Sequence, residues 1–196
     1  MVAALLAACG SGGARPEAGA QLEAAPAPTV VADYQQALAL LDGGDEAGAQ
    51  ARLQSLADSH PGYAGPLVNL ALLRARQDEL EAAAALLERA VAVCANCAAA
   101  WNELGVVQRR QGRFNDAERS YLAAIAADPD YSNAHFNLGV LYELYLQRPE
   151  LALDQYARYR ELQAGEPGAV DVDKWMTDLK RRAGVVERTA RAEEAT

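Results

Sequence analysis

Aromatic residues are scarce in this chain: they make up 6% of its 196 residues, although 51% of the residues are hydrophobic. β-Branched and aromatic side chains favour strands. Alanine, which is abundant here, is the strongest helix former, and it allows helices to approach closely. The composition therefore favours closely packed helices over sheets.

Basic residues are also few. Lysine occurs only at Lys174 and Lys180, and the formal net charge is −9. A protein that binds nucleic acid needs a basic surface, and so does one that adsorbs to an anionic membrane. We therefore expect no nucleic-acid partner and no general attraction to membranes.

Residues that carry catalysis or hold metal ions are sparse. The only histidines are His60 and His135, and no Gly-rich phosphate loop or His-Glu-x-x-His metal motif occurs. The carboxylates are scattered, as on solvated helix surfaces. The sequence predicts no catalytic residues, no metal site, no cofactor and no small-molecule substrate, so the protein is not expected to be an enzyme.

No run of apolar residues reaches the roughly 18–20 needed for a membrane-spanning helix. The apolar segment 2–8 is instead followed by Cys9 and a Gly/Ser stretch, as in a signal peptide. Leu6-Ala7-Ala8-Cys9 resembles the bacterial lipobox, and the resemblance implies a lipidated Cys9 after a signal peptide at 1–8. No basic residue precedes Cys9, which we attribute to a start codon assigned too far downstream. The alternative is an alanine-rich terminus with an incidental cysteine.

Residues 9–29 are expected to be the lipid-anchor cysteine and a flexible Gly/Pro/Ala tether. Gly10 follows the cysteine, where lipoproteins retained at the inner membrane have aspartate. The resemblance therefore implies the bacterial outer membrane, with the folded part on its periplasmic face. The membrane is then contacted only through the N-terminal lipid.

The body of the chain repeats with a period of 34 residues. Leu104-Gly105 recurs as Leu138-Gly139, 34 positions later, and other positions show the same spacing. The coincident series are Ala37, Ala71, Gly105 and Gly139; Ala49, Ala83 and Ala117; Leu53, Leu87 and Tyr121; and Leu56, Ala90 and Ala124.

Segment 98–131 resembles the tetratricopeptide repeat (TPR). The matching residues are Trp101, Leu104, Gly105, Gly112, Phe114, Ala117, Tyr121, Ala124 and Pro129. Gln108 departs, since the family usually has tyrosine there. The small residues suit the contact between two helices, the glycine suits the turn, and the proline stops the second helix. The resemblance implies an all-α fold, a right-handed α-solenoid of four TPR helix pairs with a C-terminal capping helix.

We place the repeats at 30–63, 64–97, 98–131 and 132–166. In the fourth repeat Ala152 and Tyr156 come one residue late, which predicts an insertion near 146–149 that lengthens the first helix. The capping helix is expected within 167–184, ending at Gly184, before a charged tail at 185–196. Its apolar face is expected to hold Val172, Trp175, Met176 and Leu179.

In the TPR family the first helices of the pairs line a concave groove that binds a protein or peptide partner. The residues at these positions are Tyr34, Leu38, Leu41, Val68, Leu72, Arg76, Asn102, Val106, Arg109, Arg110, Asn133, Phe136, Val140 and Glu143. This pattern predicts a partner whose apolar side chains dock beside a carboxylate. Ordinary packing for the leucines and a solvated face for Arg109 and Arg110 are the alternatives. The lysine–asparagine carboxylate clamp of chaperone-binding TPR proteins is not matched, because none of these positions holds lysine.

Cys94 and Cys97 lie between the second and third repeats. In an oxidising periplasm they could form a short structural disulfide. They could also stay reduced and inert, or Cys97 could act as a redox thiol at a helix start.

The overall plan resembles that of outer-membrane TPR lipoproteins that assist pilus assembly, secretion or TonB-type energy transduction. The sequence therefore predicts a periplasmic adaptor in an envelope complex, with the TonB-associated kind slightly preferred. An adaptor for cell-wall hydrolases and a thiol or redox protein are the alternatives.

Overall fold

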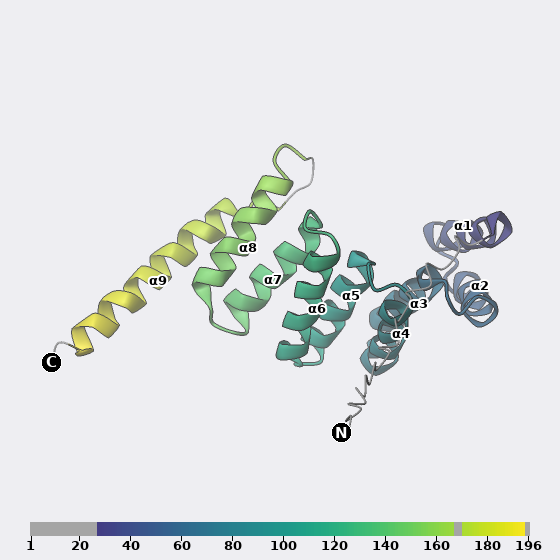
Figure 1. Cartoon of the computed structure of the whole chain (residues 1–196), viewed down its shortest axis with the longest axis horizontal. Coiled ribbons are helices and arrows are strands. Elements are labelled where there is room, and N and C mark those ends of the chain that lie inside the picture. Colours follow the sequence, from purple (N-terminus) through teal and green to yellow (C-terminus); the bar gives the residue numbers. More distant parts are fainter. Residues whose placement is uncertain (1–26, 167–169, 195–196) are drawn as a thin grey trace, which may run out of the picture.

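The computed structural model describes residues 27–166 and 170–194, and these residues form nine helices and no strand (Figure 1). The helices are α1 (Pro28–Asp42), α2 (Glu46–Ser59), α3 (Ala64–Arg76), α4 (Leu80–Val93), α5 (Ala98–Arg110), α6 (Phe114–Ala127), α7 (Ser132–Leu144), α8 (Pro149–Leu162) and α9 (Asp173–Glu194). None of them is long and apolar enough to cross a bilayer.

The first eight helices form four pairs that stack in chain order, followed by α9 (Figure 1). The first helices of successive pairs also pack together, α3 with α5 and α5 with α7. The second helices make no comparably close packing with one another in the described part. The stack therefore curves with the first helices on its inner side. The predicted all-α solenoid with a C-terminal capping helix is confirmed.

The repeated small residues lie where the two helices of each pair meet. A Cβ atom on Gly105 would come within 2.5 Å of the Tyr121 ring, and one on Gly139 within 2.6 Å of the Tyr156 ring. The aromatic ring of the second helix therefore fills the space that a side chain on the first helix would need. This contact explains why the 34-residue pattern combines glycine with tyrosine.

The turns inside the first three pairs have the same hydrogen-bond pattern. In the first three repeats the turn closes with a hydrogen bond between residues five apart, such as Arg113 N–H to the Gln108 carbonyl at 2.9 Å. Each of the four turns holds one residue with positive φ, namely Gly44, Asp78, Gly112 and Gln147. Glycine adopts this conformation at little cost, whereas other residues are strained in it.

The prediction that the insertion lengthens the first helix of the fourth repeat is wrong. Helices α5 and α7 both have 13 residues. The extra residue lies in the turn, where Arg148 N–H bonds to the Tyr142 carbonyl, six residues back. The turn absorbs the residue because the Gly139–Tyr156 contact fixes the register of α7 against α8.

Helix α9 covers the end of the stack. Its buried side chains Met176 and Leu179, with the preceding Val172, join one apolar cluster with Tyr156 and Tyr159. The predicted end at Gly184 is wrong, because the helix continues to Glu194. Glycine inside a helix costs only about 1 kcal/mol, and the residues that follow are mostly Ala, Arg and Glu, which are good or acceptable helix formers. The charged segment 185–194 is therefore helical.

Candidate partner-binding surface

The A face is the surface of α1, α3, α5 and α7 on the inner side of the curve. One position of each first helix carries a half-buried aliphatic side chain, 34 residues apart. These four residues, the A-face row, are Leu38, Leu72, Val106 and Val140. Val68 and Leu41 are half-buried beside them, so the A face presents an apolar stripe that remains partly accessible to a partner.

Hydrogen bonds between neighbouring first helices fix their spacing. Asn69 Nδ2 donates to Tyr34 Oη at 2.6 Å, and Asn137 Nδ2 donates to Asn102 Oδ1 at 2.9 Å. Arg110 Nη1 donates to the Ala75 carbonyl at 2.8 Å. Each bond joins residues 35 apart. The two asparagine bonds occupy equivalent repeat positions, between α1 and α3 and between α5 and α7, whereas Arg110 makes a different bond between α3 and α5.

Three predicted groove residues therefore make hydrogen bonds to other residues of the same chain. Asn102 is only 2% exposed and is not available to a partner. Arg110 also donates to Asp78 at 2.9 Å, which ties it to the second repeat. Tyr34 packs over Gly65 and edge-on against Tyr63, with ring centroids 5.2 Å apart. Sequence position indicates which face a residue is on, but it does not reveal such internal partners.

Helix α9 makes the same kind of contact as a further first helix. Trp175 lies against Phe136, with ring centroids 5.9 Å apart, and the guanidinium of Arg182 bonds to Glu143. Both pairs are 39 residues apart, four more than the pairs between the other first helices. Helix α9 therefore takes the place of a first helix after a longer connection.

This placement corrects the predictions for three further residues. Phe136 was expected to line the groove that contacts a partner, but its ring packs against Tyr156, Tyr159 and Trp175. The Glu143 side chain is 9% exposed and bonds to Tyr156 and Arg182. Trp175, expected on the buried face of α9, is 41% exposed and continues the A face beyond Phe136.

The polar A-face residues that remain accessible are Arg76, Asn133 and Arg109. Arg76 and Asn133 are exposed, and Arg76 lies 3.6 Å from the carboxylate of Glu46. Arg109 is half-buried, with its guanidinium carbon 5.8 Å from the centre of the Tyr145 ring. A cation over an aromatic face is attracted to it.

Tyr121 was not among the predicted groove residues, yet its hydroxyl lies among A-face groups. Burial raises the pKa of Tyr121 to about 12, against a smaller lowering by the nearby charge of Arg109. The charges of Glu103 and Tyr145 raise the pKa of Tyr121 further. The signal was present in the sequence: a tyrosine packed behind Gly105 must direct its hydroxyl towards the next turn of α5.

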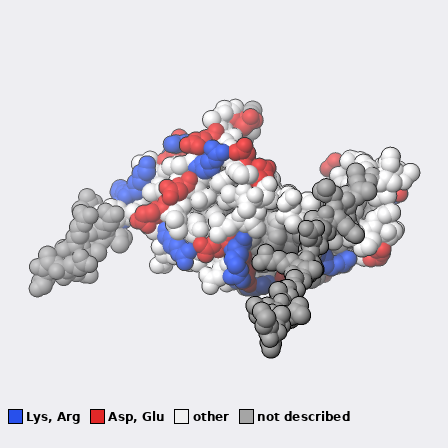
Figure 2. Space-filling model, viewed as in Figure 1, with Lys and Arg blue, Asp and Glu red and all other residues white. Residues whose placement is uncertain are grey.

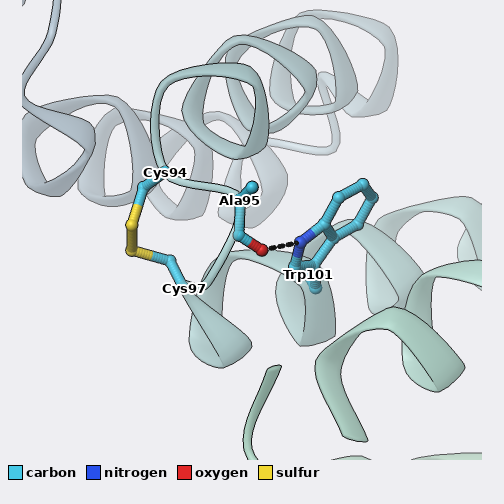
Figure 3. The surroundings of a disulfide bond; sticks show 4 residues. All are labelled: Cys94, Ala95, Cys97 and Trp101. Atoms are coloured by element: carbon cyan, nitrogen blue, oxygen red, sulfur yellow. Dashed lines mark hydrogen bonds between the residues drawn. A yellow bond between two sulfur atoms is a disulfide. The ribbon is translucent and has the colours of Figure 1, made fainter. Parts of the chain in front are cut away.

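Cys94 and Cys97 are joined by a disulfide, with their Cα atoms 5.4 Å apart (Figure 3). It spans the connection between α4 and α5, where the Trp101 indole N–H donates to the Ala95 carbonyl at 2.9 Å (Figure 3). The disulfide reading of this pair is thus the one that the structure adopts.

The described residues contain no cluster of three or more side chains that could hold a metal ion. His135 is buried between Gln155 and the Pro129 carbonyl, within 3.0 Å of each. Figure 2 shows acidic and basic side chains interspersed on the visible described surface, without a continuous basic area. Cys9 lies outside the described residues.

A family model described as tetratricopeptide repeat matches residues 34–96, 68–114 and 102–167. Among solved structures, the PilF protein of Pseudomonas aeruginosa is similar with a TM-score of 0.68 and 25% identity, over 82% of this chain and 72% of PilF. A MamA structure is similar with a TM-score of 0.64 and 20% identity, over 85% of this chain and 91% of MamA. The O-GlcNAc transferase of Thermobaculum terrenum matches at 30% identity and a TM-score of 0.59, over 67% of this chain but 26% of that enzyme. No curated protein sequence matches.

Proposed function

Because the chain belongs to the tetratricopeptide-repeat family, we propose that it is a non-catalytic adaptor that binds a protein partner along the A face. The observation that carries this proposal is the A-face row, which repeats one half-buried aliphatic side chain on four successive first helices. Each repeat of a solenoid packs mainly on its neighbours, which leaves an extended surface rather than an enclosed pocket. Such a surface suits a helix or extended segment of another protein.

The contacts between first helices support this proposal. The Asn69–Tyr34, Arg110–Ala75 and Asn137–Asn102 bonds hold the helices at fixed spacing before any partner arrives. A preorganised surface loses less conformational entropy on binding. The buried polar residues of the A face thus maintain its shape, while the aliphatic row and Arg109 meet the partner.

Photo-crosslinking in the native bacterium tests this proposal. A benzophenone amino acid would replace Val106 on the A face and, as the matched control, Leu122 on the outer helix α6, where it is 46% exposed. We expect one predominant crosslinked protein from position 106 and little from position 122. Crosslinking of that protein from position 122 alone would contradict the proposal.

We further propose that the adaptor is anchored through a lipid on Cys9 to the bacterial outer membrane and works in the periplasm. The support is the Leu6-Ala7-Ala8-Cys9 sequence and the Gly/Pro/Ala segment after it. Two or more acyl chains give stable anchoring. Expressed from its own locus, the protein should incorporate labelled palmitate and fractionate with outer membranes. Equal labelling of a Cys9→Ser variant would rule the anchor out.

We place this adaptor in an envelope complex for energy transduction of the TonB type or for pilus or secretion assembly. An adaptor for cell-wall hydrolases is the second candidate, and the identity of the protein crosslinked from position 106 decides between them.

A thiol or redox role is the third candidate. The Cys94–Cys97 disulfide supports a structural role instead, because it ties together the ends of α4 and α5. The variant with both cysteines changed to serine should lose at most about 2 kcal/mol of stability, since the closed loop is very short. It should still bind its partner. Loss of function with normal folding and binding would favour the redox role.

A further inference from the structure

Two tyrosines occupy equivalent places in the third and fourth repeats. The Tyr121 ring packs against Gly105 and the Tyr156 ring packs against Gly139. Each hydroxyl lies near the residue four positions after that glycine, which is Arg109 in the third repeat and Glu143 in the fourth. The two sites can therefore be compared group by group.

The fourth repeat contains a complete polar chain. The Tyr156 hydroxyl donates to Glu143 Oε2 at 2.9 Å, and the guanidinium of Arg182 donates to Glu143 Oε1. A carboxylate thus lies between a hydroxyl and a guanidinium, and both of its oxygens accept hydrogen bonds. Hydrogen bonds to charged groups are stronger than those between neutral groups.

The third repeat has the hydroxyl and the guanidinium but not the carboxylate. Tyr121 is fully buried, and its hydroxyl lies beside the Arg109 guanidinium, which lowers the pKa of Tyr121. The two groups do not form a hydrogen bond of normal geometry, and neither the hydroxyl nor Arg109 Nε has another partner among the described residues. Such weakly satisfied buried donors favour binding of a strong acceptor. The other two arginines of the A face, Arg76 and Arg110, each lie beside a carboxylate, whereas no ion pair of Arg109 is formed in the described part.

We propose that a carboxylate of the partner docks between Arg109 and the Tyr121 hydroxyl and completes there the arrangement that Glu143 completes in the fourth repeat. The proposal rests on the proposed function, since it names the chemistry that the A face recognises. Carboxylate oxygens accept from a guanidinium in two parallel bonds, so the group matches these donors in charge and geometry.

The surroundings define how the carboxylate enters. Arg109 Nε and the Tyr121 hydroxyl are shielded from water, but the Arg109 side chain as a whole is half-buried. The carboxylate therefore first contacts the terminal amino groups of Arg109. To reach the buried Tyr121 hydroxyl, it needs the Arg109 guanidinium to rotate aside. Val106, in the next turn of α5, provides an apolar contact for the carbon atoms beside the carboxylate.

One acidic residue opposes this binding. The charge of Glu103 raises the pKa of the Tyr121 hydroxyl. Burial raises the pKa of the Glu103 carboxyl, and a hydrogen bond from Asn102 lowers it by a smaller amount. A like charge beside the site weakens the binding of a second carboxylate. Changing Glu103→Gln keeps the acceptor for Asn102 and should tighten carboxylate binding.

A titration of the full chain with small carboxylates tests the proposal without any partner. The readout is the NMR signal of the Arg109 Nε–H group in arginine-labelled protein. N-acetyl-glutamate α-methylamide represents an acidic side chain, N-acetyl-alanine represents a C-terminal carboxylate, and sodium chloride controls for ionic strength. We expect a saturable shift with at least one of the two carboxylates, and the stronger one identifies the source.

Variants complete the test. Tyr121→Phe should weaken the carboxylate affinity by about threefold or more, because one donor is lost. Arg89→Gln, the control at an exposed arginine on the second helix α4, should leave it unchanged. No shift beyond that with chloride, or equal affinity in Tyr121→Phe, would overturn the inference. Failure of the crosslinking experiment would instead count against the proposed function, because the titration does not depend on it.

Discussion

At the scale of single residues, Tyr121 and Tyr156 share a position in the repeat but differ in their hydrogen bonding. Tyr121→Phe removes a hydroxyl that contacts the Arg109 guanidinium without a hydrogen bond of normal geometry, so the free energy of unfolding should change by less than about 1 kcal/mol. Tyr156→Phe leaves Glu143 without one of its hydrogen-bond donors, so it should lower the free energy of unfolding by about 1–2 kcal/mol. Urea denaturation of both variants measures the difference. Equal destabilisation by the two changes would contradict the comparison.

The buried tyrosines also make stability depend on pH in the alkaline range. Burial raises the pKa of Tyr121 to about 12, and burial with the Glu118 carboxylate raises that of Tyr142 to about 12. A tyrosine in the unfolded chain titrates near pH 10. Since the folded state holds these protons more tightly, the stabilisation is complete below about pH 10 and is lost as pH rises towards about 12.

Unfolding in urea at a series of pH values between about 8 and 12 measures this effect. The free energy of unfolding should fall above about pH 10, and it should fall less steeply in Tyr121→Phe. The same slope in the variant and the unchanged protein would show that Tyr121 does not contribute.

At the scale of elements, each turn inside a helix pair contains one residue with positive φ, and the turns differ in how well that residue suits this conformation. Gln147 has φ of 54° and Gly112 has φ of 75° at the equivalent place. Gln147→Gly should raise the free energy of unfolding by up to about 1 kcal/mol, and Gly112→Ala should lower it by about 1 kcal/mol or more. Thermal unfolding of the two variants measures both changes. A loss of stability in Gln147→Gly would mean that its side chain outweighs the backbone strain.

The helix pairs themselves could be predicted from the sequence, because their cause is local and periodic. Small residues at Gly105 and Gly139 and large ones at Tyr121 and Tyr156 follow directly from the contact that they make. The position of α9 could not be predicted in the same way. Its contacts with α7 lie 39 residues apart, outside the repeat period, so nothing in the pattern indicates that Trp175 covers Phe136.

At the scale of the whole molecule, the sequence identifies which residues belong to the A face but not which of them are free. Asn102 matched a partner-binding position, yet Asn137 from the next repeat occupies it. Arg109 matched the same kind of position and has no ion pair in the described part of the chain. Whether an A-face residue is free depends on the identity of the side chain about 35 residues away, and the repeat period does not indicate whether the two form a bond.

We propose that the curved stack of helices binds its partner on the side of the first helices. The apolar residues on the opposite side supply a matched comparison. Leu72 belongs to the A-face row, and Leu122 on α6 is exposed on the outer side. Both are leucines on a helix surface, so the same substitution can be made at each.

The most direct test is the dissociation constant of the partner identified by crosslinking, measured by calorimetry with Leu72→Glu and Leu122→Glu, with helicity checked by circular dichroism. A charge placed in a binding surface should weaken the affinity for the partner by about tenfold or more, while a charge outside that surface should change the affinity little. We predict that loss for Leu72→Glu and an affinity within about twofold of the unchanged protein for Leu122→Glu. The reverse result, with both variants fully helical, would contradict it.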